Sequence, residues 1–127
     1  KIEAPICLET APRGLVNGKT YRLGANLNTI PVDEQLFAND SHCMVSLQSD
    51  TLGLYEKDTG RGVVCDIAEF PYCLLWSKPG MPQFVCIEPW YGRCDKVGYE
   101  GEFAQRDWVI HLSANGSFRT YYTIELL

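Results

Sequence analysis

The sequence of 127 residues predicts an all-β fold, an antiparallel β-sandwich that forms one domain over residues 1–127. Short apolar or alternating runs recur along the chain, and Gly, Pro, Asn or Asp residues bound each of them. Two of the intervals between these runs have the composition of hairpin turns. Only residues 31–37, where Pro31 precedes acidic residues, have features of a helical turn.

The predicted elements of the first half follow from this alternation. Residues 43–48 alternate apolar and polar side chains and are predicted to form a strand. Residues 52–56 and 62–67 flank a turn rich in Gly and Asp at 57–62, which predicts a hairpin.

The second half continues the pattern with four more runs. Residues 72–77 are continuously apolar before Lys-Pro-Gly, and residues 84–88 form the next apolar run. Residues 108–112 and 118–126 surround Ser-Ala-Asn-Gly-Ser at 113–117, so we expect a hairpin there. The alternation in 118–126 predicts one face in the core and one partly in water.

Composition and charge exclude several classes of protein. The chain is 46% hydrophobic and 21% charged, as expected of a folded globule. Its net charge is -5 and its basic residues are scattered, which argues against nucleic-acid binding. No apolar run approaches the roughly 20 residues needed to span a bilayer, so no membrane partner is expected. No Gly-x-Ser-x-Gly sequence and no glycine-rich phosphate loop is present.

Six cysteines admit either a disulfide framework or reduced thiols. Four of them lie in apolar runs, where free Cys behaves as a small hydrophobic residue: Cys43, Cys65, Cys73 and Cys86. We therefore expect reduced thiols and a cytoplasmic location. No Cys-x-x-Cys pair occurs, so no structural metal is expected.

Glu88 is the first candidate for chemistry. It follows four apolar residues, 84–87, and precedes Pro-Trp-Tyr-Gly, so we expect a carboxylate at the end of a buried strand. A buried carboxylate is costly unless it is paired or has a function. The sequence leaves two alternatives open, a base in an aromatic-walled site or an ion pair with Arg93 or Lys78.

The other candidates are one carboxylate and two aromatic side chains. Asp40 leads from a loop into a strand, where it either binds a ligand or caps a turn together with Asn39. Trp76 and Trp90 lie next to loops rich in Pro and Gly and are able to stack on a sugar ring. Trp108 is expected to pack in the core, and His42 and His111 to be structural histidines.

Three motifs occur in a fixed order: Leu-Phe-Ala-Asn-Asp at 36–40, Phe-Pro-Tyr-x-x-x-Trp-Ser-Lys-Pro-Gly at 70–80, and Phe-Val-Cys-Ile-Glu-Pro-Trp-Tyr-Gly at 84–92. In this order they resemble the aldose 1-epimerase (galactose mutarotase) superfamily, and within it the bacterial LacX-like branch. The resemblance covers residues 36–92 and the end of the chain, whereas residues 1–30 carry little of it.

The resemblance implies a β-supersandwich, the galactose mutarotase-like fold, and an aldose 1-epimerase acting on a hexose such as galactose or glucose. Glu88 matches the family's base, which takes the proton from the anomeric hydroxyl. Asp40 matches the aspartate that holds ring hydroxyls, and Trp76 and Trp90 would line the pocket. No metal or organic cofactor is implied.

The family's acid histidine precedes the Asp40 motif in a Gly-His-Pro-x-Phe-like segment, which is not found in residues 1–127. We therefore expect this chain to be the C-terminal part of such a protein, with the N-terminal part as its partner. Residues 1–127 by themselves would then expose an apolar face and an unpaired sheet edge and be inactive.

The alternative to an aldose 1-epimerase is a non-catalytic carbohydrate-binding sandwich. Whether the sugar is phosphorylated would depend on Arg93 and Arg106.

Overall fold

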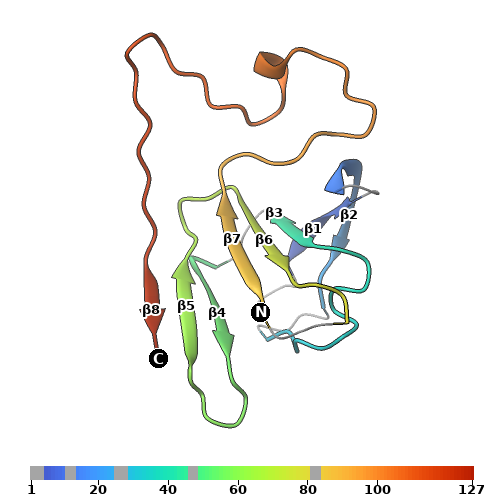
Figure 1. Cartoon of the computed structure of the whole chain (residues 1–127), viewed down its shortest axis with the longest axis vertical. Helices are drawn as coiled ribbons and strands as arrows, with labels where there is room; N and C mark the ends of the chain where they lie inside the picture. Colours follow the sequence, from blue (N-terminus) through green and yellow to red (C-terminus); the bar gives the residue numbers. More distant parts are fainter. Residues whose placement is uncertain (1–4, 11–13, 25–28, 46–48, 81–83) are drawn as a thin grey trace.

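The computed structural model describes residues 5–10, 14–24, 29–45, 49–80 and 84–127. Within them the chain is all-β, with two antiparallel sheets, one 3-10 turn at Phe103–Gln105 and no α-helix (Figure 1). This confirms the predicted fold class. The strands are β1 (Ile6–Thr10), β2 (Val16–Arg22), β3 (His42–Val45), β4 (Thr51–Tyr55), β5 (Gly62–Asp66), β6 (Tyr72–Trp76), β7 (Cys86–Trp90) and β8 (Ile124–Leu126).

The larger sheet has five strands in the order β2-β1-β3-β6-β7. Its adjacent central strands β3 and β6 carry most of the buried side chains of this sheet. β7 lies at the edge, which explains how Pro89 fits within it: proline cannot donate to a second neighbouring strand. The predicted strands 72–77 and 84–88 are thus found, although β7 begins and ends two residues later than expected.

The smaller sheet has the order β4-β5-β8 and contains the predicted hairpin. The turn between β4 and β5 is closed by two backbone hydrogen bonds, from Glu56 to the Arg61 carbonyl at 2.8 Å and from Gly60 to the Glu56 carbonyl at 2.9 Å. Gly62 is required where β5 begins, because a Cβ there would lie 2.2 Å from the carbonyl oxygen of Leu54.

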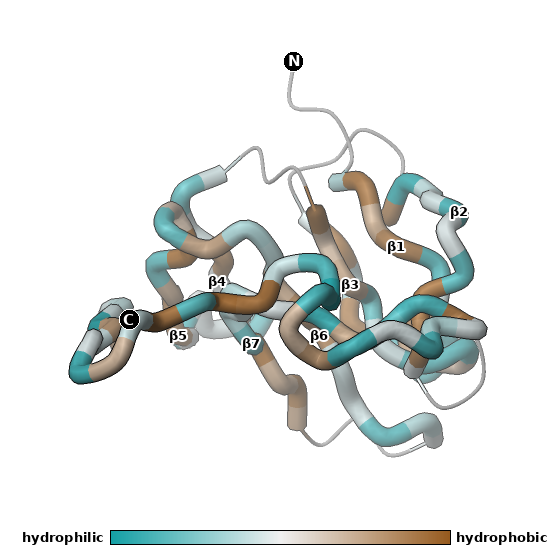
Figure 2. Tube along the Cα trace, turned by 90° about the horizontal axis from the view of Figure 1, so that it is seen from above, coloured by the Kyte–Doolittle hydropathy of each residue, from teal (hydrophilic) through white to brown (hydrophobic). Residues whose placement is uncertain are grey.

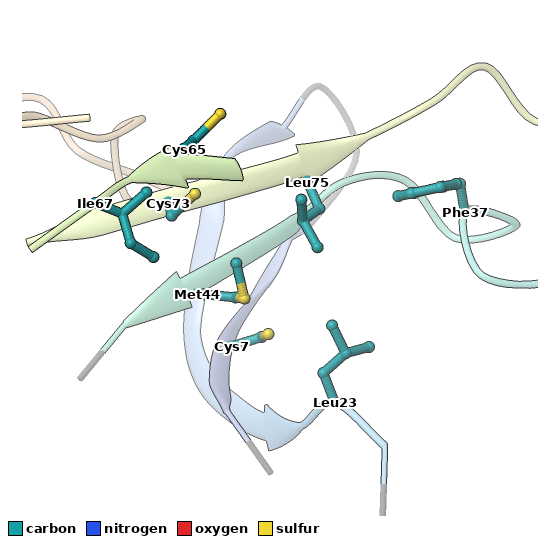
Figure 3. Close-up of a cluster of buried hydrophobic side chains, with 8 residues drawn as sticks. All are labelled: Cys7, Leu23, Phe37, Met44, Cys65, Ile67, Cys73 and Leu75. Atoms are coloured by element: carbon teal, nitrogen blue, oxygen red, sulfur yellow. The ribbon is translucent and has the colours of Figure 1, made fainter. Parts of the chain in front are cut away.

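The main core lies between the two sheets (Figure 3). Cys65, in β5, and Ile67, just after it, belong to one cluster with side chains that alternate along the larger sheet. The buried members are Cys7, Leu23, Phe37, Met44, Cys65, Ile67, Cys73 and Leu75. Free Cys and Met fill this space as small and adaptable apolar groups.

The opposite face of the larger sheet carries a second cluster, formed by Cys43, Tyr72 and Leu74. The segment that follows β7 returns to β2, where the Val16 amide donates to the Asp95 carbonyl and Val97 donates to the Val16 carbonyl, each at 2.9 Å. This segment therefore connects β7 and β2, the two edge strands of the sheet.

The predicted hairpin of 108–112 with 118–126 is wrong. A turn does occur at 113–116, but only Ile124–Leu126 forms a strand, and this strand pairs with β5. The segment between β7 and β8 makes a long excursion before it returns to β5 (Figure 1). Phe118, Thr120 and Tyr122 do face Tyr91 and Phe70, but all three remain exposed, so the alternation within 118–126 does not create a buried face.

Residues 110–127 are exposed throughout and include many large apolar side chains (Figure 2). Tyr121 is 85% exposed and Leu126 is 80% exposed. Exposed apolar surface on this scale commonly marks a contact with another segment or protein. The expectation that residues 1–127 expose an apolar face therefore agrees with the structure.

Two further differences concern the first half of the chain. β1 and β2 were not predicted, although Tyr21 and Leu23 alternate with polar residues. The helical turn expected at 31–37 appears as consecutive turns at 34–39 without a regular helix, and the Asp33 carboxylate caps the first of them by accepting hydrogen bonds from the amides of Gln35 and Leu36. The predicted strand 43–48 is confirmed as β3 up to Val45, and residues 46–48 lie outside the described residues.

Candidate functional site

The pairing of β6 with β7 gathers three of the four predicted site residues on one face. Leu74 lies opposite Glu88, and Trp76 lies opposite Cys86. Because side chains alternate along a strand, every second residue of each strand shares this face. The face consists of Tyr72, Leu74, Trp76, Cys86, Glu88 and Trp90. Glu88 is the central residue of β7, which corrects the expectation that it ends a strand.

Glu88 is half-buried and makes no ion pair with Arg93 or Lys78, both of which the structure describes. The Arg93 guanidinium instead binds the Asp107 carboxylate at 2.5 Å. The side chain of Cys86 lies beside Glu88: burial, and then the charge and hydrogen bond of Glu88, raise the pKa of the Cys86 thiol. Of the two alternatives for Glu88, the ion pair with these cations is therefore not formed.

Trp76 and Trp90 bracket Glu88 at the two ends of this face. Trp90 is half-buried and packs on the cluster of Cys43, Tyr72 and Leu74. Trp76 is also half-buried, with its ring 5.7 Å from that of Phe84. A carboxylate on a surface between two indole rings is chemically suited to a sugar, because the rings cover the apolar faces and the carboxylate binds or deprotonates hydroxyls.

Asp40 lies in the loop before β3 and not on the β6–β7 face. His42 is opposite Leu75, so the chain before it continues past the end of β6 that carries Trp76. The Asp40 backbone has φ of 99°, a left-handed conformation that is uncommon for a residue with a side chain. Its Oδ1 accepts a hydrogen bond from the Ser41 amide at 2.7 Å, a local contact of the kind expected from a turn cap. No hydrogen bond or ion pair between these two described residues joins Asp40 to Glu88.

His42 is a structural histidine, as the sequence predicted. Its Nε2 lies 2.5 Å from the Leu36 carbonyl, and its Nδ1 lies 2.6 Å from the Tyr21 hydroxyl. It faces away from Glu88, because it is paired with Leu75 and Glu88 is paired with Leu74. His111 is exposed and lies in a stretch without regular structure.

Trp108 differs from its prediction. It is 55% exposed, has φ of 65° and contacts Tyr72 edge-on with the ring centroids 5.3 Å apart. It lines two open hollows, one of about 510 Å³ with Phe70 and Tyr91 and one of about 290 Å³ with Arg93 and Arg106. The sequence contained no signal for the exposed position of Trp108, because this residue lies in an apolar run that resembles a strand.

Neither hollow contains Glu88 or Asp40. Both are wide open and lined partly by the exposed residues Trp108 and Ile110, so we place the candidate site on the Glu88 face. The second hollow does not favour a phosphate group. Arg93 binds Asp107 and Arg106 binds Asp95, so carboxylates already engage both guanidinium groups.

The described parts of the chain contain no group of three His, Cys, Asp or Glu side chains that would hold a metal ion. In the same parts, no helix is long and apolar enough to cross a membrane.

All six cysteines are free, and burial determines their reactivity. Burial raises the pKa of Cys7 to about 11 and those of Cys43 and Cys73 to about 12.

We therefore expect iodoacetamide at pH 8 to alkylate the half-buried Cys86 and Cys94 more than about tenfold faster than the four buried cysteines. Peptide mass spectrometry over time measures the order, and labelling in urea should be uniform. Equal rates under native conditions would contradict this packing.

Comparison with known proteins gives one line of similarity. No family model and no solved structure matches the chain. Two curated proteins of Lactococcus lactis subsp. lactis match it, the plasmid and the chromosomal form of Protein LacX. Each is 31% identical over 67 residues, which is 53% of this chain and 22% of the LacX protein. The chain thus matches about a fifth of the length of these relatives, and over about half of its own length it is similar to LacX.

Proposed function

We propose that this protein is an aldose 1-epimerase, which interconverts the α and β anomers of a hexose, with Glu88 as its base. The observation that carries the proposal is the position of Glu88, half-buried on a sheet face between Trp76 and Trp90 and without an ion pair to Arg93 or Lys78. Similarity to LacX over about half of the chain supports it.

The proposed reaction consists of two proton transfers and a bond rotation. Glu88 takes the proton from the hydroxyl on C1 while an acid protonates the ring oxygen, and the C1–O5 bond breaks. Rotation about C1–C2 then presents the other face of the aldehyde. The C5 hydroxyl attacks it, returns its proton to the acid, and the new C1 oxygen recovers the proton from Glu88.

The remaining roles in the proposed site combine the geometry of this face with the resemblance of the motif at 36–40. The indole rings of Trp76 and Trp90 would flank the sugar, and Asp40 would hold ring hydroxyls from the loop before β3. His42 does not serve as the acid, because both of its ring nitrogens have partners and it faces away from Glu88.

We propose that the acid histidine comes from another part of the same protein, which would cover exposed apolar residues such as Tyr121, Ile124 and Leu126. The free thiols suit a cytoplasmic location.

Polarimetry tests the proposal directly. Freshly dissolved α-glucose or α-galactose is mixed with the protein as its gene encodes it. The first-order rate of mutarotation should rise in proportion to protein concentration, and heat-inactivated protein should leave the rate at its spontaneous value. Without acceleration, a sugar-dependent rise in Tm would identify the non-catalytic carbohydrate-binding protein, and absence of both effects would overturn both proposals.

A further inference from the structure

The loop that carries Asp40 has few internal constraints. Residues 31–35 are exposed, and only Phe37 within the loop is fully buried, at 2% exposure. Asp40 itself is held in a left-handed conformation, with its amide donating to the Phe37 carbonyl at 3.2 Å. Such a conformation persists only where the surrounding structure fixes it.

His42 supplies a fixed point for this loop from the adjoining strand. A carbonyl oxygen accepts hydrogen bonds, so His42 Nε2 must donate to Leu36, and Nδ1 of the neutral ring accepts from the Tyr21 hydroxyl. Burial lowers the pKa of His42 and raises the pKa of Tyr21, which agrees with a neutral imidazole and a protonated phenol. The Leu36 carbonyl thus sets the tautomer of His42, the Tyr21 hydroxyl of β2 bonds the other ring nitrogen, and the imidazole binds the loop four residues before Asp40.

Ring packing reinforces this connection. The His42 ring lies 5.6 Å from the Phe37 ring and 6.0 Å from the Tyr21 ring, measured between centroids. Tyr21 lies directly opposite Cys7 in the pairing of β2 with β1, so the chain of contacts reaches from β1 and β2 through His42 to the loop. Asp40 is therefore joined to the larger sheet from both ends of its turn.

We propose that Tyr21 and His42 form a positioning pair, which holds the Leu36 carbonyl and Phe37 and thereby presents the Asp40 carboxylate to the sugar. This rests on the proposed function, since it assigns Asp40 to substrate binding. Neither Tyr21 nor His42 is a catalytic residue in this scheme, because both act through the loop.

Kinetics on the protein as its gene encodes it separate positioning from catalysis. A hydrogen bond to a charged group contributes roughly 1.5–3 kcal/mol, so His42→Ala should raise the KM for galactose about 10-fold or more and change kcat little. His42→Gln, whose amide N–H can still reach the Leu36 carbonyl, should restore most of the KM. Tyr21→Phe should give a smaller rise.

A double-mutant cycle with Asp40→Gly, a residue suited to the left-handed backbone, tests whether His42 acts through Asp40. In the His42→Ala background, Asp40→Gly should raise KM by much less than in the unaltered protein. Additive effects, or an unchanged KM in His42→Ala, would overturn the proposal.

Hydrogen exchange distinguishes this proposal from the proposed function. The Asp40 and Ser41 amides should exchange faster in His42→Ala than in His42→Gln, and this holds whether or not sugar binds. If the unaltered protein neither binds nor converts sugar, the proposed function fails. Equal exchange in the two variants would show that the pair does not hold the loop.

Discussion

Glu88→Gln should lower the catalysed rate of mutarotation by about 100-fold or more, because general acid–base catalysis typically contributes 10²–10⁴-fold. Glutamine has nearly the same size as glutamate and keeps its place opposite Leu74 in β7. It cannot accept the proton of the C1 hydroxyl at neutral pH. The dissociation constant for the sugar should change by less than about threefold, since the Trp76 and Trp90 rings remain.

Polarimetry measures the rate in this experiment, and isothermal titration calorimetry measures sugar binding. Glu125→Gln is the matched control, because Glu125 also lies in the middle of a strand but is exposed on β8. This control should keep the full rate. An unchanged rate in Glu88→Gln would remove Glu88 as the base, and loss of both rate and binding would assign it to substrate binding.

Phe37→Ala should reduce the free energy of unfolding by about 3–5 kcal/mol, the usual cost of removing a buried phenylalanine ring. Phe37 is 2% exposed and is among the largest fully buried side chains of the chain. Its ring contacts His42, so the cavity would open directly beneath the Asp40 loop. We therefore expect lower stability together with weaker sugar binding, measured by urea unfolding and by calorimetry.

Phe103→Ala is the control for this substitution, since Phe103 is 70% exposed. It should change stability by no more than about 0.5 kcal/mol. A similar loss in both variants would show that Phe37 is not part of the core.

Local signals predicted the central strands well and the end of the chain poorly. The hairpin of β4 and β5 follows from its own turn residues, which close it through contacts near in sequence. The strand expected at 108–112 has the same apolar composition as a buried strand but pairs with no other segment among the described residues. Composition describes what a segment would bury, whereas pairing depends on which other segments are present.

In the candidate site, too, the sequence indicated the residues, whereas the fold decided their arrangement. Glu88, Asp40, Trp76 and Trp90 were selected from residue types and from a resemblance in the order of motifs. The arrangement of Glu88 between Trp76 and Trp90 depends on the register of β6 against β7, because a shift by one residue would turn the carboxylate to the other face. The absence of an ion pair with Arg93 depends on Asp107, which lies 14 residues further along the chain.

By itself, then, the sequence determined the all-β class and the hairpin of β4 and β5, since these depend on local composition and spacing, and it supplied the candidate residues Glu88, Asp40, Trp76 and Trp90. Only the tertiary structure decided that Glu88 is central in β7, that His42 serves the Asp40 loop, and that residues 110–127 remain exposed. The physical reason is that burial, hydrogen-bond partners and strand register arise from contacts between segments far apart in the chain.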